Sequence, residues 1–160
     1  MVRLVLVAVL TCILAAPADA ADAKYVKIIH VKTGKVLAVD KDSDEAGARA
    51  VLAEDNNSKA RQWKLEKEGD YYKIINRQSG KVLDVFEEAN EAGAPIIVWD
   101  SRSQKNDNQL WIWQGSGAER RLKPKSNSLV LDVDDEGRLI QQKSNDKAKS
   151  QLWRTVEVKE

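Results

Sequence analysis

The stretch YYKIINRQSGKVLDVFEEANEAGA, residues 71–94, repeats an earlier one, YVKIIHVKTGKVLAVDKDSDEAGA, residues 25–48. The two align without a gap at an offset of 46 residues and agree at thirteen of 24 positions. A weaker third copy, RRLKPKSNSLVLDVDDEGRLIQQ, covers residues 120–142, and each copy is followed by a Trp, in RQWKL, QLWIW and QLWRT. Repetition at this period indicates a fold built from three similar units.

Within each copy, short apolar runs such as YYKIIN, KVLDV and QLWIW alternate with turn-rich stretches such as RQSG and SRSQKNDN. Strand-sized runs at regular spacing are typical of an all-β barrel or sandwich. The segment 41–55 has a helix-like composition, but it aligns with a second-copy segment that contains Pro95, which favours a loop and a strand. We therefore expect one all-β domain over residues 21–160, a closed barrel of three pseudo-symmetric four-strand repeats at about 24–68, 69–116 and 117–158.

The first twenty residues, MVRLVLVAVLTCILAAPADA, contain one basic residue, an apolar run and a final Ala-x-Ala pattern. This order predicts a secretory signal peptide, and the apolar run is too short to cross a bilayer of about 30 Å as a helix. We expect residues 21–160 to be exported as a soluble extracellular protein. Cys12 is the only cysteine and lies in the segment to be removed, so we expect no disulfide.

Charge and composition exclude several classes of function. The 26 Lys and Arg residues and 25 Asp and Glu residues are interspersed and leave a net charge of +1, which argues against a nucleic-acid or membrane partner. His30 is the only histidine, so neither a zinc cluster nor a histidine-based relay can form. The segment DKDSDEAG, residues 40–47, begins like a calcium loop but has Glu45 where Gly is needed and Val51 where an acid should close the cage. We expect no cofactor and no metal.

The ends of the copies carry a shared motif: QLW at residues 109–111 and 151–153, and the looser RQW at 61–63. With the VLDV-like segments upstream, these motifs make the chain resemble the ricin B (R-type) lectin family over residues 25–158. The resemblance implies a β-trefoil fold and carbohydrate binding. Because Trp63, Trp111 and Trp153 recur once per copy, we expect them to be core residues that fill the same place in each unit.

A sugar site needs a carboxylate and an amide for the hydroxyls and an aromatic ring for the C–H face. The resemblance implies this set in the second copy: Asp84 accepts from two adjacent hydroxyls, Asn108 bonds one of them, and Trp99 stacks on the ring. Gln109 would mainly hold Asp84 in place. Trp99 precedes Gln109 by ten residues, and we expect this interval to span a turn that brings Trp99 and Asn108 to opposite sides of a shallow pocket.

The other copies match the set less well. In the first, Ala38 stands at the position of the second copy's carboxylate and Ala53 at that of its Trp, so both are lost.

The third copy keeps Asp132 and Gln151, but Gln141 or Gln142 falls at the Trp position and Ser150 replaces the Asn. We expect one working pocket, in the second copy, with the third as a weaker second candidate.

Two departures from the resembled family affect the second copy. Ile97 stands where family members commonly have a Gln, two positions before the aromatic residue. Many members also carry a disulfide at the positions of Val82 and Ser101, so we expect the loop here to be held by packing alone.

These features favour a secreted, non-enzymatic lectin for galactose- or N-acetylgalactosamine-type glycans. Enzymes of the resembled family usually carry catalysis on another domain, and no carboxylate pair stands out as a glycosidase pair. One shallow site typically binds a sugar with a millimolar constant, about −4 kcal/mol, so avidity needs an oligomer or a multivalent glycan surface. The alternative is a β-trefoil that binds or inhibits proteins through its loops, with degenerate sugar sites.

Overall fold

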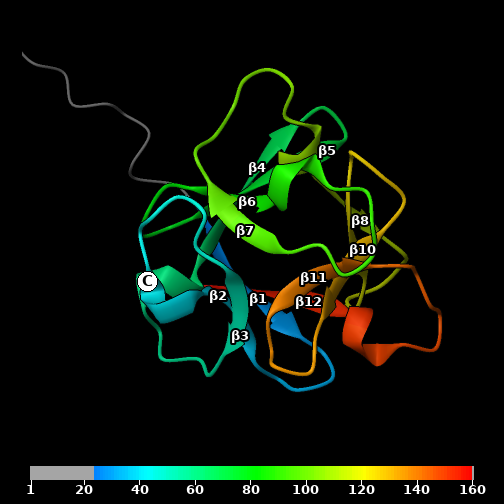
Figure 1. Cartoon of the computed structure of the whole chain (residues 1–160). Coiled ribbons are helices and arrows are strands. Elements are labelled where there is room, and N and C mark those ends of the chain that lie inside the picture. Colours follow the sequence, from blue (N-terminus) through cyan, green and yellow to red (C-terminus); the bar gives the residue numbers. More distant parts are fainter. Residues whose placement is uncertain (1–23, 160) are drawn as a thin grey trace, which may run out of the picture.

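The computed structural model describes residues 24–159, so the expected signal peptide and Cys12 lie outside the described residues. Residues 24–159 form a small all-β domain (Figure 1). A unit of four strands recurs three times in it. The first unit contains β1 (Tyr25–His30), β2 (Val36–Val39), β3 (Ala50–Ala53) and β4 (Trp63–Glu68). The second contains β5 (Tyr71–Asn76), β6 (Val82–Val85), β7 (Ile96–Trp99) and β8 (Trp111–Gln114). The third contains β9 (Arg121–Pro124), β10 (Val130–Val133), β11 (Leu139–Gln142) and β12 (Trp153–Glu157).

Short 3₁₀ turns occupy equivalent places in the units. Three of them precede the last strand of a unit: η2 (Lys59–Arg61), η4 (Asp107–Gln109) and η5 (Lys149–Gln151). Two follow the second strand, η1 (Asp40–Asp42) and η3 (Phe86–Glu88). The segment 41–55 therefore forms a short turn, a loop and strand β3 rather than a helix, as predicted.

Six strands close into a barrel. The first and last strands of the units pair antiparallel in the order β12–β1–β4–β5–β8–β9. The ring is completed between β12 and the residue before β9, where Arg120 and Trp153 exchange backbone hydrogen bonds of 2.9 and 2.8 Å. Closure pairs the edges that an open sheet would expose.

The remaining strands form three hairpins, β2–β3, β6–β7 and β10–β11, that cover one end of the barrel. Each hairpin touches the next in cyclic order, through the bridges Arg49–Ile97, Pro95–Ile140 and Arg138–Val51. A six-stranded barrel capped by three hairpins around a pseudo-threefold axis is a β-trefoil. The predicted fold is confirmed.

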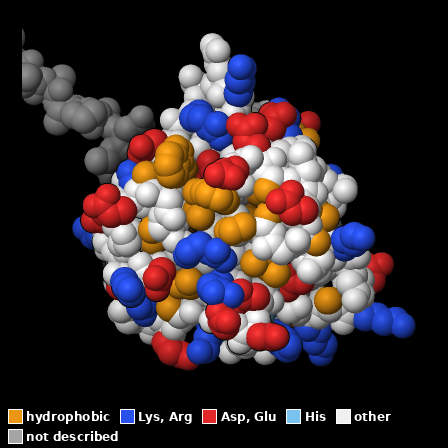
Figure 2. All heavy atoms as spheres, viewed as in Figure 1, with side chains coloured by type: hydrophobic (Ala, Val, Ile, Leu, Met, Phe, Trp, Pro, Cys, Tyr) orange, Lys and Arg blue, Asp and Glu red, His pale blue; other side chains and the backbone are white. Residues whose placement is uncertain are grey.

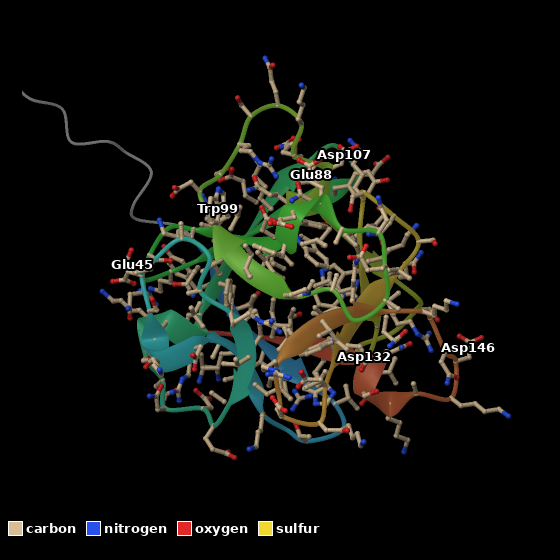
Figure 3. All side chains as sticks on the ribbon, in the orientation of Figure 1. Glu45, Glu88, Trp99, Asp107, Asp132 and Asp146 are labelled. Atoms are coloured by element: carbon tan, nitrogen blue, oxygen red, sulfur yellow. The ribbon has the colours of Figure 1, made fainter. Side chains whose placement is uncertain are left out.

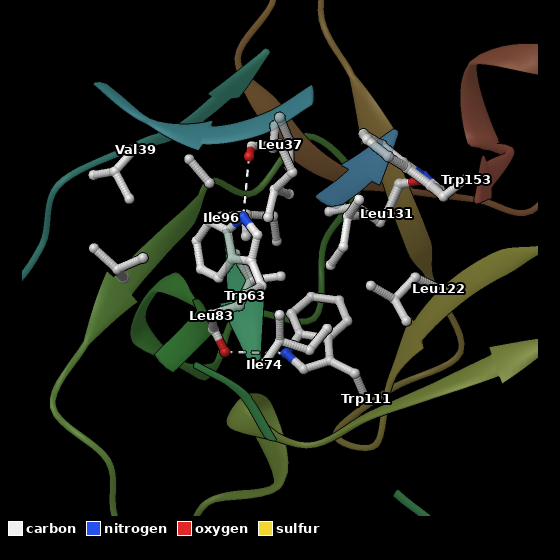
Figure 4. Packing of buried hydrophobic residues seen from close by; sticks show 14 of the residues in the cluster. Leu37, Val39, Trp63, Ile74, Leu83, Ile96, Trp111, Leu122, Leu131 and Trp153 are labelled. Atoms are coloured by element: carbon white, nitrogen blue, oxygen red, sulfur yellow. Dashed lines mark hydrogen bonds between the residues drawn. The ribbon is translucent and has the colours of Figure 1, made fainter. Parts of the chain in front are cut away.

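The core lies on the axis and is filled by equivalent residues of the three units (Figure 4). Trp63, Trp111 and Trp153 are fully buried, which confirms their predicted place. Each indole N–H donates to the backbone carbonyl of a Leu on the second strand of its own unit. The three pairs are Trp63–Leu37 at 3.0 Å, Trp111–Leu83 at 3.0 Å and Trp153–Leu131 at 3.2 Å.

The turns η1 and η3 share an uncommon backbone conformation. Lys41 and Asp42 in the first unit and Glu87 and Glu88 in the second all have φ between 51 and 56°. Non-glycine residues rarely adopt this left-handed region. In the second unit this turn carries two carboxylates toward the mouth of the cavity described below. Within residues 24–159, no helix has the length and apolarity to cross a membrane.

The fold predicts different costs for two tryptophan substitutions. Trp111→Ala should lower the free energy of unfolding by roughly 3–5 kcal/mol, because it empties part of the core and leaves the Leu83 carbonyl unpaired. Trp99→Ala should cost less than about 1 kcal/mol, because the side chain is 42% exposed. Urea unfolding of both variants measures the difference. Equal losses would mean that Trp99 belongs to the core.

Candidate functional site

The second unit brings the four predicted site residues together. Asp84 on β6 pairs with Ile97 on β7, and Trp99 follows two residues later, so all three side chains lie on the same face of the hairpin. Asn108 and Gln109 come from η4. Asp84, Trp99 and Asn108 border a shallow cavity of about 370 Å³. Its full lining is Asp84, Phe86, Glu87, Glu88, Ile97, Trp99, Arg102 and Asn108. Gln109 is fully buried beside Asp84 and does not line the cavity.

Asp84 is a buried carboxylate, only 3% exposed, held by two amides. Its Oδ1 accepts from Asn108 Nδ2 at 2.7 Å, and its Oδ2 accepts from Gln109 Nε2 at 2.8 Å. Burial raises the pKa of Asp84 to about 6, although the hydrogen bond from Gln109, the charge of Arg102 and the hydrogen bond from Asn108 act in the opposite direction. The carboxylate is therefore ionised at neutral pH and close to its titration range.

Trp99 forms the apolar wall of the cavity and is positioned by a neighbouring unit. A Cβ built on Gly47 would lie 3.3 Å from Cζ3 of the Trp99 ring, so this glycine permits the first-unit loop to approach the ring closely. The Gly47 N–H also donates to the Val98 carbonyl at 2.8 Å. Phe86 lines the same cavity and is 39% exposed. Figure 2 shows hydrophobic side chains gathered around the place where Figure 3 labels Trp99.

Arg102 is part of the site although no motif predicted it. Its Nη2 donates to Asn108 Oδ1 at 2.6 Å and lies 3.6 Å from Asp84 Oδ2. Its Nη1 bonds Glu88 Oε1 at 3.0 Å. The interval between Trp99 and Gln109 contains two basic residues, Arg102 and Lys105, and no motif distinguishes one from the other.

The expectation that packing alone holds this loop is wrong. The loop carbonyl of Arg102 accepts from Lys73 Nζ at 2.9 Å and from Asn106 Nδ2 at 3.1 Å. Glu68 bonds both donors, at 3.2 Å from the ammonium and 3.3 Å from the amide. The Arg102 N–H in turn donates to Gln109 Oε1 at 2.9 Å. A polar network rooted in β4 and β5 thus fixes the loop where relatives were expected to use a disulfide.

The third unit keeps the acid–amide pair without the aromatic wall. Gln151 Nε2 donates to Asp132 Oδ2 at 2.9 Å, as its counterpart does in the second unit. The other oxygen of Asp132 accepts from the N–H of Val133 at 2.8 Å. In the second unit Trp99 lies opposite Val82, and in the third unit Gln142 lies opposite Val130, the equivalent residue. Gln142, and not Gln141, therefore occupies the position of the Trp.

The first unit lacks the pair altogether. Ala38 takes the place of the carboxylate, and Arg61 that of the motif amide. The Arg61 side chain reaches Asp42 instead, with Nε 3.5 Å from Oδ1. Asp44 Oδ1 accepts from Gln78 Nε2 at 2.8 Å, so the acidic loop is engaged in protein contacts. Across residues 24–159, no cluster of three or more candidate metal ligands was found.

Comparison with known proteins agrees with the β-trefoil fold. A model of the ricin-type β-trefoil lectin domain-like family matches residues 14–99, and a model of the ricin-type β-trefoil lectin domain matches residues 70–160. A search of curated proteins gave no match.

Solved structures share the fold. The designed threefold-symmetric protein ThreeFoil is 28% identical over 84% of this chain and 99% of its own, with a TM-score of 0.78. An exo-β-1,3-galactanase from Clostridium thermocellum is 32% identical over 86% of this chain with a TM-score of 0.78, but the match covers only 31% of the galactanase. The Macrolepiota procera ricin B-like lectin, solved in complex with lactose, is 15% identical over 84% of this chain and 96% of its own, with a TM-score of 0.69. The chain belongs to the ricin-type β-trefoil lectin domain family, a family of carbohydrate-binding domains.

Proposed function

We propose that the protein is an exported lectin that binds galactose- or N-acetylgalactosamine-type sugars through one pocket in its second unit. The observation that carries the proposal is a buried acid–amide cluster that opens beside an exposed tryptophan ring in one cavity. Asp84 and Asn108 provide the polar side of the pocket, and Trp99 provides the apolar side.

The arrangement suits a hexose chemically. An ionised carboxylate accepts hydrogen bonds from two neighbouring hydroxyls, and charge-assisted bonds of this kind are stronger than neutral ones. The indole face of Trp99 covers the C–H face of the sugar and removes apolar surface from water. Gln109 fixes the carboxylate from behind without reaching the ligand.

Two similar structures support the galactose class: the lectin was solved with lactose, and the enzyme is named for galactan. The signal-like residues 1–20 support export. With one pocket per chain, glycoconjugates that present many copies of the sugar are the partners expected to bind with useful avidity.

Titration followed by NMR of the indole N–H signals tests the proposal. The chain has five Trp residues, and lactose or N-acetylgalactosamine to about 50 mM should saturate a millimolar site. We expect the Trp99 indole to shift saturably and Trp99→Ala to lose binding while it stays folded. If all five signals stay still, the sugar assignment fails, and a protein-binding scaffold becomes the next hypothesis to test.

Matched asparagine substitutions separate the second unit from the third. Asp84→Asn should weaken lactose binding at least roughly tenfold, because the charged acceptor is replaced by a neutral one. Asp132→Asn makes the same change beside Gln151, the equivalent amide, and should leave the Trp99 titration unchanged. Lactose-induced indole shifts that persist in Asp84→Asn and vanish in Asp132→Asn would place the sugar in the third unit.

The pKa of Asp84, about 6, predicts a pH dependence of binding. Affinity for lactose should be constant above about pH 7 and should approach a tenfold loss per pH unit below 6, because the protonated acid loses its charge. The contribution of Asp84 to folding stability changes in the opposite direction: since its pKa is raised in the folded state, that contribution grows as the pH falls through 6. A loss of lactose affinity between pH 7 and 5 therefore does not come from unfolding caused by the titration of Asp84.

Lactose titrations at about pH 7.5, 6 and 5 measure this dependence, with indole signal dispersion as the check on folding. His30→Asn is the control, because His30 is the only histidine and Asn76 occupies its position in the second unit. Burial lowers the pKa of His30, which lies outside the cavity. This variant should keep the pH dependence; a flat wild-type profile would show that Asp84 does not accept from the sugar.

A further inference from the structure

The amides of the site have no hydrogen left to give a ligand. Asn108 Nδ2 donates to Asp84 Oδ1 at 2.7 Å and to the Val85 carbonyl at 3.0 Å. Gln109 Nε2 donates to Asp84 Oδ2 at 2.8 Å and to the Asp100 carbonyl at 2.9 Å. A side-chain amide carries two N–H hydrogens, so both groups are fully used. Asn108 presents only its oxygen to the cavity, a narrower role than the sequence suggested.

A sugar hydroxyl needs donors as well as acceptors. Each hydroxyl donates one hydrogen bond and accepts up to two, and an oxygen buried against Asp84 without a donor would lose hydration that nothing replaces. Among the side chains that line the cavity, only Asn108, Trp99 and Arg102 carry N–H groups. Both amide hydrogens of Asn108 already have protein acceptors. A tryptophan that stacks on the sugar with its face directs its N–H along the ring plane, away from the stacked sugar. Arg102 is the remaining donor.

The guanidinium of Arg102 lies where such a donor is needed. Its Nη2 is 2.6 Å from Asn108 Oδ1 and 3.6 Å from Asp84 Oδ2, so a hydroxyl that donates to either acceptor lies within its reach. A guanidinium has five N–H donors in a rigid fork. The backbone of Arg102 is held on both sides, by Lys73 at its carbonyl and by Gln109 at its N–H. The donor is thus positioned before the ligand arrives.

Glu88 orients this donor. Its Oε1 accepts from Arg102 Nη1 at 3.0 Å, which leaves Nη2 directed at the acceptors. Glu87 lines the cavity as well, so the cavity is lined by three carboxylates and a single guanidinium when Asp84 is ionised. An acidic sugar would enter against this excess of negative charge, whereas a neutral sugar would not.

We propose that Arg102 is a specificity-determining residue that donates hydrogen bonds to hydroxyl oxygens of a neutral galactoside, with Glu88 orienting its guanidinium and disfavouring acidic sugars. This inference rests on the proposed function and names a residue and a ligand class within the same pocket.

The first test combines arginine variants with deoxy sugars. Arg102→Met keeps an unbranched apolar side chain without the donors, and Arg102→Lys keeps the charge without the fork. Methyl β-galactoside should bind Arg102→Met roughly tenfold or more weakly than wild type, with partial rescue in Arg102→Lys. Arg154→Met, an exposed arginine on β12 outside the cavity, is the control for loss of charge and should bind as wild type does.

Monodeoxy galactosides distinguish a direct contact from loop damage. In wild type, removal of the hydroxyl that Arg102 contacts should weaken binding; in Arg102→Met, the same removal should have little further effect. If Arg102→Met instead keeps the full wild-type sensitivity to every deoxy sugar, Arg102 acts only on the loop and the inference is wrong. Indole signal dispersion shows whether each variant is folded.

The second test compares galacturonic acid with galactose. Wild type should bind the acid several-fold more weakly, and Glu88→Gln should raise the ratio of acid to neutral affinity, because it removes one of the carboxylates that face the ligand. If Glu88→Gln leaves the ratio of acid to neutral affinity unchanged, Glu88 does not disfavour acidic sugars. If wild type binds no galactoside at all, the proposed function and this inference fail together; if wild type binds and Arg102→Met binds equally well, only the inference fails.

Discussion

The hydrogen bond from the Trp111 indole to the Leu83 carbonyl connects the core to the candidate site. Asp84 follows Leu83 directly, and Gln109 precedes Trp111 by two residues, so the bond that seats the ring in the core also fixes the amide against the carboxylate. The same register recurs in the third unit, where Trp153 is tied to the residue before Asp132. A buried indole N–H needs a partner, and the fold meets this need three times with one geometry.

The three units share one backbone fold but differ in the side chains at the position of the candidate site. The first unit keeps the core bond but has Ala38 beside it, and the third keeps the acid without an aromatic wall. Both fold as the second does, because the site residues lie outside the cluster of apolar side chains that forms the core. The second unit is nonetheless incomplete alone, since Trp99 rests on Gly47 of the first unit. The cavity therefore depends on the trefoil closing around its axis.

Repetition made most of the fold predictable, along with the part of the site that repeats. Three copies of one pattern indicated the strands and the core tryptophans, and the motif implied that Gln109 supports Asp84. The role of Arg102 and the hydrogen bonds that hold its backbone could not be predicted, because the loop before η4 differs between copies. The contacts of this loop also join residues that are far apart in the chain. A faint signal existed: Lys27, Lys73 and Arg121 each precede a core residue in the first strand of a unit, and each bonds the loop before the last strand of its unit. A charged residue on a strand is usually solvated, so its sequence position alone does not indicate a structural role.

The electrostatics of the pocket follow from how its charges are held. Burial disfavours the charged form of Asp84, and two neutral amides and one nearby guanidinium offset only part of that cost, so the pKa of its carboxyl remains raised. The amides give all their hydrogens to the protein, which leaves a carboxylate and an amide oxygen facing the cavity beside one cationic donor. Such a surface is complementary to groups that donate and accept at the same atom. Hydroxyls have this property and anions do not, and this hydrogen-bond inventory is the physical basis of the proposed preference for a neutral sugar.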